Sequence, residues 1–138
     1  MSTEANRAIL VAIHDGLAEG DARAFIQAMA EDFTWIMGGT TDWSGTYAGK
    51  AVVRGELLAP LMTRFKSYRN SARRIIVDGD WAAVQCRGDA ETTEGRRYDN
   101  DYCWIYRFRE GRIVELIEYM DTELVRSALG PFQRVAVQ

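Results

Sequence analysis

The sequence is poor in the residues that build metal centres and disulfide frameworks. It has two cysteines, Cys86 and Cys103, and a single histidine, His14, in 138 residues. Two cysteines do not form a disulfide framework, and together with one histidine they do not form a metal-binding set. We expect both thiols to stay reduced. A glycine-rich phosphate loop is missing as well, so we expect no cofactor.

Long apolar runs and an excess of positive charge are also missing. No stretch reaches the ~20 apolar residues that a membrane-spanning helix needs. Glu4 comes early and no long apolar run follows it, which is unlike a signal peptide. We therefore expect a cytoplasmic protein that does not bind membranes. Lysine and arginine total 17 against 20 acidic residues, and this mild acidity argues against a nucleic-acid partner.

Apolar and aromatic residues are plentiful. They make up 47% and 11% of the chain, enough for a hydrophobic core and for the walls of a cavity. The length fits one domain of ordinary size. We expect a single domain over residues 1–138, with its core at about 5–129 and a short C-terminal tail over 124–138.

The first half of the chain has the period of helices. Leu10, Ile13 and Leu17 recur at helical spacing, and Thr3 is a candidate N-cap for their helix. A proline at position 60 should kink or split the longest helix. The elements expected here are helices over 3–17, from an Asp21 cap onward and over 50–68, a strand over 33–37 and a loop over 38–49.

The second half has the shorter period of strands. Glycine-containing turns at 78–80, 94–95 and 110–111 separate four runs that are rich in β-forming residues. These expected strands cover 71–77, 81–92, 97–109 and 112–120. Helices that precede an antiparallel meander predict an α+β fold, with the helices packed on one face of the sheet.

Three segments resemble SnoaL-like proteins of the nuclear-transport-factor-2-like, or ketosteroid-isomerase-like, superfamily. Residues 98–122 resemble the last two strands, residues 18–25 and 31–35 the helix pair and first strand, and residues 43–49 the rim of the pocket. The resemblance implies a cone-shaped curved antiparallel sheet, with three N-terminal helices enclosing an apolar pocket for a small molecule. It also implies a homodimer through the outer sheet face, where Cys103, Ile105 and Ile117 would lie.

Two catalytic variants of this superfamily do not fit the sequence. The three catalytic positions of ketosteroid isomerases fall on Ile13, Met37 and Trp104, none of which has the required chemistry. Scytalone-dehydratase-like chemistry resembles a histidine pair, and this chain has only His14. We expect His14 to serve packing or to lie at the surface.

A third variant depends on a strand register. Arg87-Gly88-Asp89 resembles half of the Asp-Arg-Asp set of limonene epoxide hydrolases, with Glu118 as the second carboxylate. A two-residue turn at 94–95 would point Arg87 and Asp89 into the pocket. A three-residue turn at 93–95 would point them outward, with Arg87 opposite Asp101. We favour the second register because it separates apolar from charged residues better.

Glu118 is the strongest candidate for chemistry. A bulged three-residue turn at 109–111 would pair Tyr102 with Glu118 and place this carboxylate on the inner face beside Trp104. Apolar surroundings would raise its pKa toward that of a useful general acid or base. The resemblance implies the same role, since the acidic residue of SnoaL-like cyclases at this position is the acid/base.

The remaining candidates would bind or enclose the substrate. Asn100 and Tyr102 share the inner face and would orient a substrate oxygen. The expected pocket walls are Trp35, Met37, Trp43, Leu57, Leu61, Tyr98 and Trp104. The sequence therefore predicts a small-molecule enzyme that uses carboxylate proton transfer, as an isomerase, cyclase, dehydratase or epoxide-hydrolase-like enzyme. A non-catalytic binder of hydrophobic ligands and a dimerisation module remain the alternatives.

Overall fold

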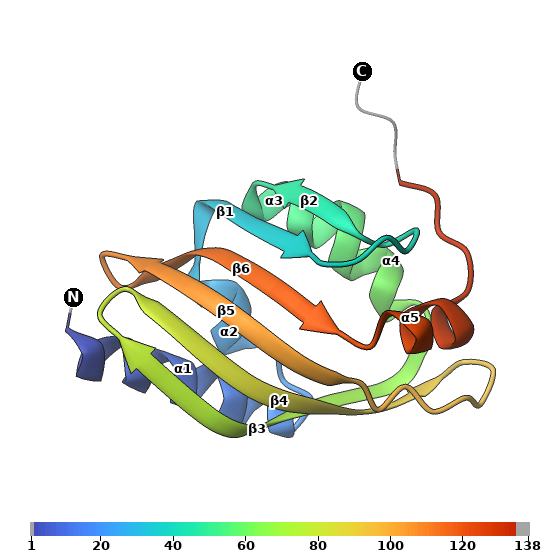
Figure 1. Ribbon diagram of the computed structural model, residues 1–138, viewed down its shortest axis with the longest axis horizontal. Helices are drawn as coiled ribbons and strands as arrows, with labels where there is room; N and C mark the ends of the chain where they lie inside the picture. Colours follow the sequence, from blue (N-terminus) through green and yellow to red (C-terminus); the bar gives the residue numbers. More distant parts are fainter. Residues whose placement is uncertain (1, 135–138) are drawn as a thin grey trace.

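The computed structural model describes residues 2–134 and shows an α+β fold built on one curved, open sheet (Figure 1). The strand order is β2-β1-β6-β5-β4-β3, and every neighbouring pair is antiparallel except β1 and β6, which are parallel. The strands are β1 (Met29–Met37), β2 (Gly45–Ala48), β3 (Phe65–Asp78), β4 (Trp81–Thr92), β5 (Asp101–Arg109) and β6 (Arg112–Met120).

The helices gather on one face of this sheet. In Figure 1, α1 lies behind the strands near β3, α2 lies behind β5 and β6, and the segment from α3 to α4 lies behind β1 and β2. The helical elements are α1 (Thr3–Ala18), α2 (Arg23–Ala28), α3 (Lys50–Val52), η1 (Val53–Leu58), α4 (Ala59–Met62) and α5 (Thr122–Leu129). The α+β class and the helix-covered sheet are confirmed.

The N-cap of the first helix differs from the prediction by one residue. The Ser2 hydroxyl accepts a hydrogen bond from the Ala5 amide and caps α1. Thr3 instead accepts from the backbone amide of Gly79 and ties the helix to the β3–β4 turn. Near α2, the Asp21 carboxylate accepts from the Arg23 amide, one residue ahead of the helix's own cap position.

The predicted long helix over 50–68 is wrong in its second half. Helical structure ends at Met62, and β3 begins at Phe65. The helical part is divided as the proline suggested, because Pro60 stands in the first turn of α4, directly after the π-helix η1. Residues 65–70 are needed as a strand because β4 continues to Thr92, and Phe65 pairs with that residue.

Two further elements were not expected. The Gly-rich segment over 38–49 contains the short strand β2, which pairs with β1 through Trp35 and Tyr47. The C-terminal segment contains α5, whose first turn is capped by Asp121. A four-residue strand gives too short an alternation to be distinguished from a loop by sequence period alone.

The register between β4 and β5 is the one that we favoured from the sequence, with Arg87 and Asp89 pointing outward. Arg87 pairs with Asp101, and Glu91 bridges to Arg97 on either side of a three-residue turn. The register between β5 and β6 differs from the prediction, because Arg109 pairs with Arg112 across a two-residue turn. A bulge shifts the pairing between Phe108, which pairs with Ile113, and Arg107, which pairs with Glu115. Glu118 therefore lies opposite Trp104 rather than Tyr102.

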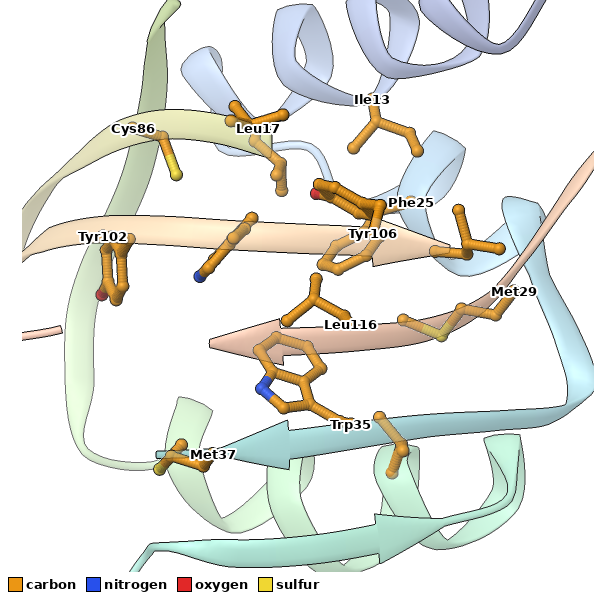
Figure 2. Packing of buried hydrophobic residues seen from close by; sticks show 14 of the residues in the cluster. Ile13, Leu17, Phe25, Met29, Trp35, Met37, Cys86, Tyr102, Tyr106 and Leu116 are labelled. Atoms are coloured by element: carbon orange, nitrogen blue, oxygen red, sulfur yellow. The ribbon is translucent and has the colours of Figure 1, made fainter. Parts of the chain in front are cut away.

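The core lies between the concave face of the sheet and the helices. Figure 2 shows side chains from α1, β1, β5 and β6 directed into this space, among them Ile13, Trp35, Tyr106 and Leu116. The central strands β4 and β5 alternate buried with exposed or half-buried residues, as a sheet with one covered face requires. Among the described residues, no helix is long and apolar enough to cross a membrane.

Candidate active site

An apolar cavity of about 310 Å³ opens between the sheet and the helices. Its walls come from both layers, with aromatic side chains from the sheet facing aliphatic side chains from the helical segments. The lining residues are Leu17, Ala22, Phe25, Ile26, Trp35, Met37, Arg54, Leu58, Ala59, Leu61, Met62, Tyr68, Tyr98, Tyr102, Trp104, Glu118 and Leu129. Glu118 and Arg54 are the charged members of this set.

Glu118 lies deep in the cavity wall. It stands on β6 between Trp104 of β5 and Met37 of β1, and only 4% of it is exposed. Two indole N–H groups hold its carboxylate. Trp104 Nε1 donates to Oε2 at 2.8 Å, and Trp35 Nε1 donates to Oε1 at 3.3 Å. Each carboxylate oxygen therefore has one protein donor and keeps a lone pair for another partner.

The surroundings of Glu118 raise its pKa. Burial favours the neutral acid and raises the pKa to about 7, while the hydrogen bonds from Trp104 and Trp35 oppose this rise. At neutral pH the group is therefore present both as carboxylate and as carboxylic acid. A side chain in this state can accept a proton and return it, which is what general acid/base catalysis requires.

A chain of hydroxyl groups lies on another part of the cavity wall. The Asn70 amide donates to the Tyr68 hydroxyl at 3.4 Å, and Tyr68 donates to the Tyr102 hydroxyl at 3.0 Å. The direction of these bonds leaves the Tyr102 proton available to another acceptor. Burial raises the pKa of Tyr68 and of Tyr102 above the usual tyrosine range, so both remain neutral donors.

The structure places Asn100 behind the wall and not in it. Its amide nitrogen donates to the Tyr98 hydroxyl at 3.2 Å and to the Asp121 carbonyl oxygen, and its amide oxygen accepts from the Asp121 backbone amide. These bonds connect the start of β5 to the junction of β6 and α5. Asn100 thus supports Tyr98, which does line the cavity.

Arg87 and Asp89 lie on the outer face of the sheet, away from Glu118. Arg87 forms an exposed ion pair with Asp101 at 3.2 Å. Arg97 bridges the carboxylates of Asp89 and Asp99. The structure therefore does not bring an Arg-x-Asp pair together with Glu118. The close approach of Asp89 and Asp99 across the strands is offset by the arginine between them.

The predicted walls divide into two groups. Trp35, Met37, Leu61, Tyr98 and Trp104 line the cavity, as Tyr102 does. Figure 2 shows Met37 near the helical segment and Tyr102 near the start of β5. Trp43 and Leu57 lie outside the lining set.

The two outside residues are both buried elsewhere. Trp43 stacks on Phe132 with a centroid distance of 3.7 Å, and the exposed fraction of Leu57 is 0%. Both support the fold behind the cavity.

His14 is buried in the core and not part of the cavity lining. Its Nε2 lies 3.1 Å from the Tyr106 hydroxyl, and its ring centroid lies 5.6 Å from that of Trp104. Burial lowers the pKa of His14 to about 4, so the ring is neutral at physiological pH. Cys86 is buried, and both cysteines are free.

Tyr68 and Arg54 line the cavity but were missed from the sequence. Tyr68 was assigned to the long helix, although the partner strand offered a signal. A strand over 81–92 that returns through a turn at 78–80 must pair with residues back to about position 66, which makes 65–70 a strand. Arg54 carried no comparable signal, because an arginine in a helix is usually a solvated surface residue.

The sequence and the fold both match known proteins. A model of the SnoaL-like domain family matches residues 10–116. No curated protein matches the chain. Three solved structures illustrate the shared fold, each with an identity below 25%, so they establish the fold alone.

One is an NTF2-like protein of unknown function from Burkholderia pseudomallei, with a TM-score of 0.79 and 20% identity, covering 93% of this chain and 98% of that chain. Another is TerC co-crystallised with polyporic acid, with a TM-score of 0.77 and 22% identity, covering 91% and 98%. The third, from Jannaschia, is described as a candidate SnoaL-like polyketide cyclase, with a TM-score of 0.75 and 16% identity, covering 91% and 92%.

Proposed function

This chain belongs to the SnoaL-like domain family, and from that premise we propose that it is a small-molecule enzyme in which Glu118 is the general acid/base. The observation that carries the proposal is a carboxyl group buried in an apolar cavity, with its pKa raised to about 7. A general base works best when its pKa lies near the operating pH. The apolar walls favour a mostly hydrophobic substrate that bears an oxygen function.

The proton transfer proceeds in two balanced steps. The Glu118 carboxylate removes a proton from a carbon next to a carbonyl group. The C–H electron pair forms a C=C bond, and the π pair of the C=O bond moves onto the oxygen to give an enolate. The resulting carboxylic acid then returns the proton to another carbon or to an oxygen. Isomerisation, aldol-type cyclisation and dehydration all use such steps, and hydrolysis uses the same group to activate water.

Tyr102 is placed to assist at the substrate oxygen. Tyr68 already donates to the Tyr102 oxygen, so the Tyr102 proton is free to bond to an oxygen that gains negative charge. A preorganised donor in a dry cavity is worth more to a developing charge than the same donor in water. Asn100 acts through Tyr98, to which it donates, and is therefore a positioning residue.

The test is proton exchange from carbon acids in heavy water. We expect the wild-type protein to exchange the acidic C–H protons of aromatic ketones that bind in the cavity, and NMR would record the loss of signal. The Glu118→Gln variant keeps the size of the side chain but cannot accept the proton. Its exchange rate should fall by about a hundredfold or more.

A second candidate function follows from the two indole bonds to Glu118. Because both carboxylate oxygens already have a donor, the group can also be a satisfied part of a pocket that binds a ligand without turnover. The same experiment separates the two. Ketones that bind equally to both proteins but exchange in neither favour the binder, and equal exchange in both would exclude Glu118 as the base.

A further inference from the structure

Arg54 is the one cation among the described residues that line the cavity. It belongs to η1 and is exposed to solvent, whereas Glu118 is buried. An arginine that both lines the cavity and contacts solvent stands at the cavity mouth. The cavity thus has a carboxyl group in its depth, a guanidinium at its entrance and apolar walls between them.

The position of Arg54 on its helical segment is unusual. Leu58, Leu61 and Met62 follow it and line the same cavity, so Arg54 belongs to an otherwise apolar face. Val53, its neighbour, is fully buried. Charged side chains on helices usually point away from the apolar face. Arg54 is exposed at the edge of this face, which brings its charge to the mouth of the cavity and not into its depth.

Within residues 2–134 no carboxylate lies within ion-pair distance of Arg54. Burial raises the pKa of Glu118 against the lowering effect of the two indole hydrogen bonds, and Arg54 has no part in it. Arg64 is a contrast, because its guanidinium donates to the carbonyl oxygens of Leu129 and Pro131 and so supports the C-terminal segment. The Arg54 guanidinium is available to a ligand.

We infer that Arg54 anchors the carboxylate of an amphiphilic organic acid whose apolar body fills the cavity. A guanidinium offers paired N–H donors that match the two oxygens of a carboxylate. The aromatic walls, among them Trp35, Tyr98 and Trp104, fit a flat or ring-containing body. That the reacting centre of this acid points toward Glu118 rests on the proposed function, whereas recognition of its carboxylate does not.

The test compares two probes of nearly the same shape, the anion naphthylacetate and its neutral primary amide naphthylacetamide. Binding is followed by quenching of tryptophan fluorescence, since Trp35 and Trp104 line the cavity. At about pH 6, where the probe is ionised and Glu118 is mostly neutral, wild type should bind the acid about three- to tenfold more tightly than the amide. Added salt should reduce this preference.

Two variants decide what causes the preference. Arg54→Gln should abolish it while leaving the affinity for the amide unchanged, which also shows that the cavity is intact. Arg69→Gln removes the same charge from an exposed arginine outside the lining set and should keep the preference. The inference is overturned if wild type binds both probes equally, if Arg54→Gln keeps the preference, or if it weakens both probes alike.

The outcome is independent of the proton-transfer test. Binding of the two probes needs no turnover, and it can be repeated in the Glu118→Gln variant. If Glu118→Gln still prefers the acid over the amide and the double variant Glu118→Gln/Arg54→Gln does not, the role of Arg54 as anchor is supported even if Glu118 is not a base. Proton exchange without any preference for the acid supports the base and removes the anchor.

Discussion

At the scale of single residues, the chemistry depends on one carboxyl group in a dry place. Glu118 is held by two indoles, and Tyr102, which lines the same cavity, stays neutral because burial raises its pKa. Within the part of the chain that the structure describes, no charged side chain offsets the burial of Glu118. The same isolation that makes Glu118 suitable for proton transfer also makes its ionisation unfavourable for folding.

The pH dependence of stability should reveal this cost. The folded-state pKa of Glu118 is about 7 against a usual 4.5, so between these values the folded state binds more protons than the unfolded state. Stability must then fall as pH rises through this range, by an upper limit on the order of 3 kcal/mol. Urea unfolding at about pH 5 and about pH 8 would measure the fall.

The Glu118→Gln variant is the control for that measurement. It cannot ionise, so it should lack this part of the pH dependence. Asp21, Asp32 and Asp99, whose pKa values are lowered by arginine partners, act equally in both proteins and cancel in the comparison. An equal fall in both proteins would mean that Glu118 titrates near its usual value, which also weakens the enzyme proposal.

At the scale of elements, alternation in the sequence predicted the strands well, because one face of the sheet is covered. Trp104, Tyr106 and Glu118 all face inward as the period of two requires. Charge pairing between Arg87 and Asp101 identified the correct β4–β5 register. These features are local, and a single sequence contains them.

What could not be predicted depends on partners distant in the chain. Residues 65–70 are a strand because β4 needs a partner there, not because of their own period. The predicted β5–β6 turn was one residue longer than the observed one. The bulge that follows the observed turn shifts the register once more, so Glu118 still points inward as predicted. Tyr68 and its hydrogen bond to Tyr102 were missed because residues 65–70 were not recognised as a strand.

The helix α5 contributes to the site through its cap. The Asp121 carboxylate accepts from the amides of Glu123 and Leu124 at 3.0 and 3.2 Å, and Leu129 at the far end of α5 lines the cavity. Asp121→Ala should lower the free energy of unfolding by about 1 kcal/mol. Asp121→Asn can still cap and should be close to wild type. Equal losses in a denaturant titration would show that the cap is not the cause.

At the scale of the whole molecule, the outer face of the sheet carries exposed apolar side chains. Ile76 and Trp81 are 56% and 48% exposed and form a shallow hollow with Ile105. Cys103 and Ile117 lie on the same face, half-buried. An exposed apolar area on a sheet suits an interface, and we retain the prediction that a second copy of the chain covers it.

Light scattering should therefore give twice the mass of one chain. Trp81→Glu places a charge in this hollow and should shift the protein toward monomer at low micromolar concentration. Val11→Glu adds the same charge at an exposed apolar position on α1, 42% exposed, and should leave the mass unchanged. A monomeric wild type, or equal effects of the two substitutions, would contradict the outer-face interface.

The parallel pairing of β1 with β6 also affects how the protein is made. During synthesis, β1 leaves the ribosome well before β6, its neighbour toward the middle of the sheet, because β6 is the last strand in the sequence and ends at Met120. Until that strand arrives, β1 has only the four-residue β2 beside it, and its tryptophan and methionine face no completed layer. The two halves of the sheet are therefore joined by the last of its strands to be made, and until then β1 exposes an unpaired strand edge of the kind that favours aggregation.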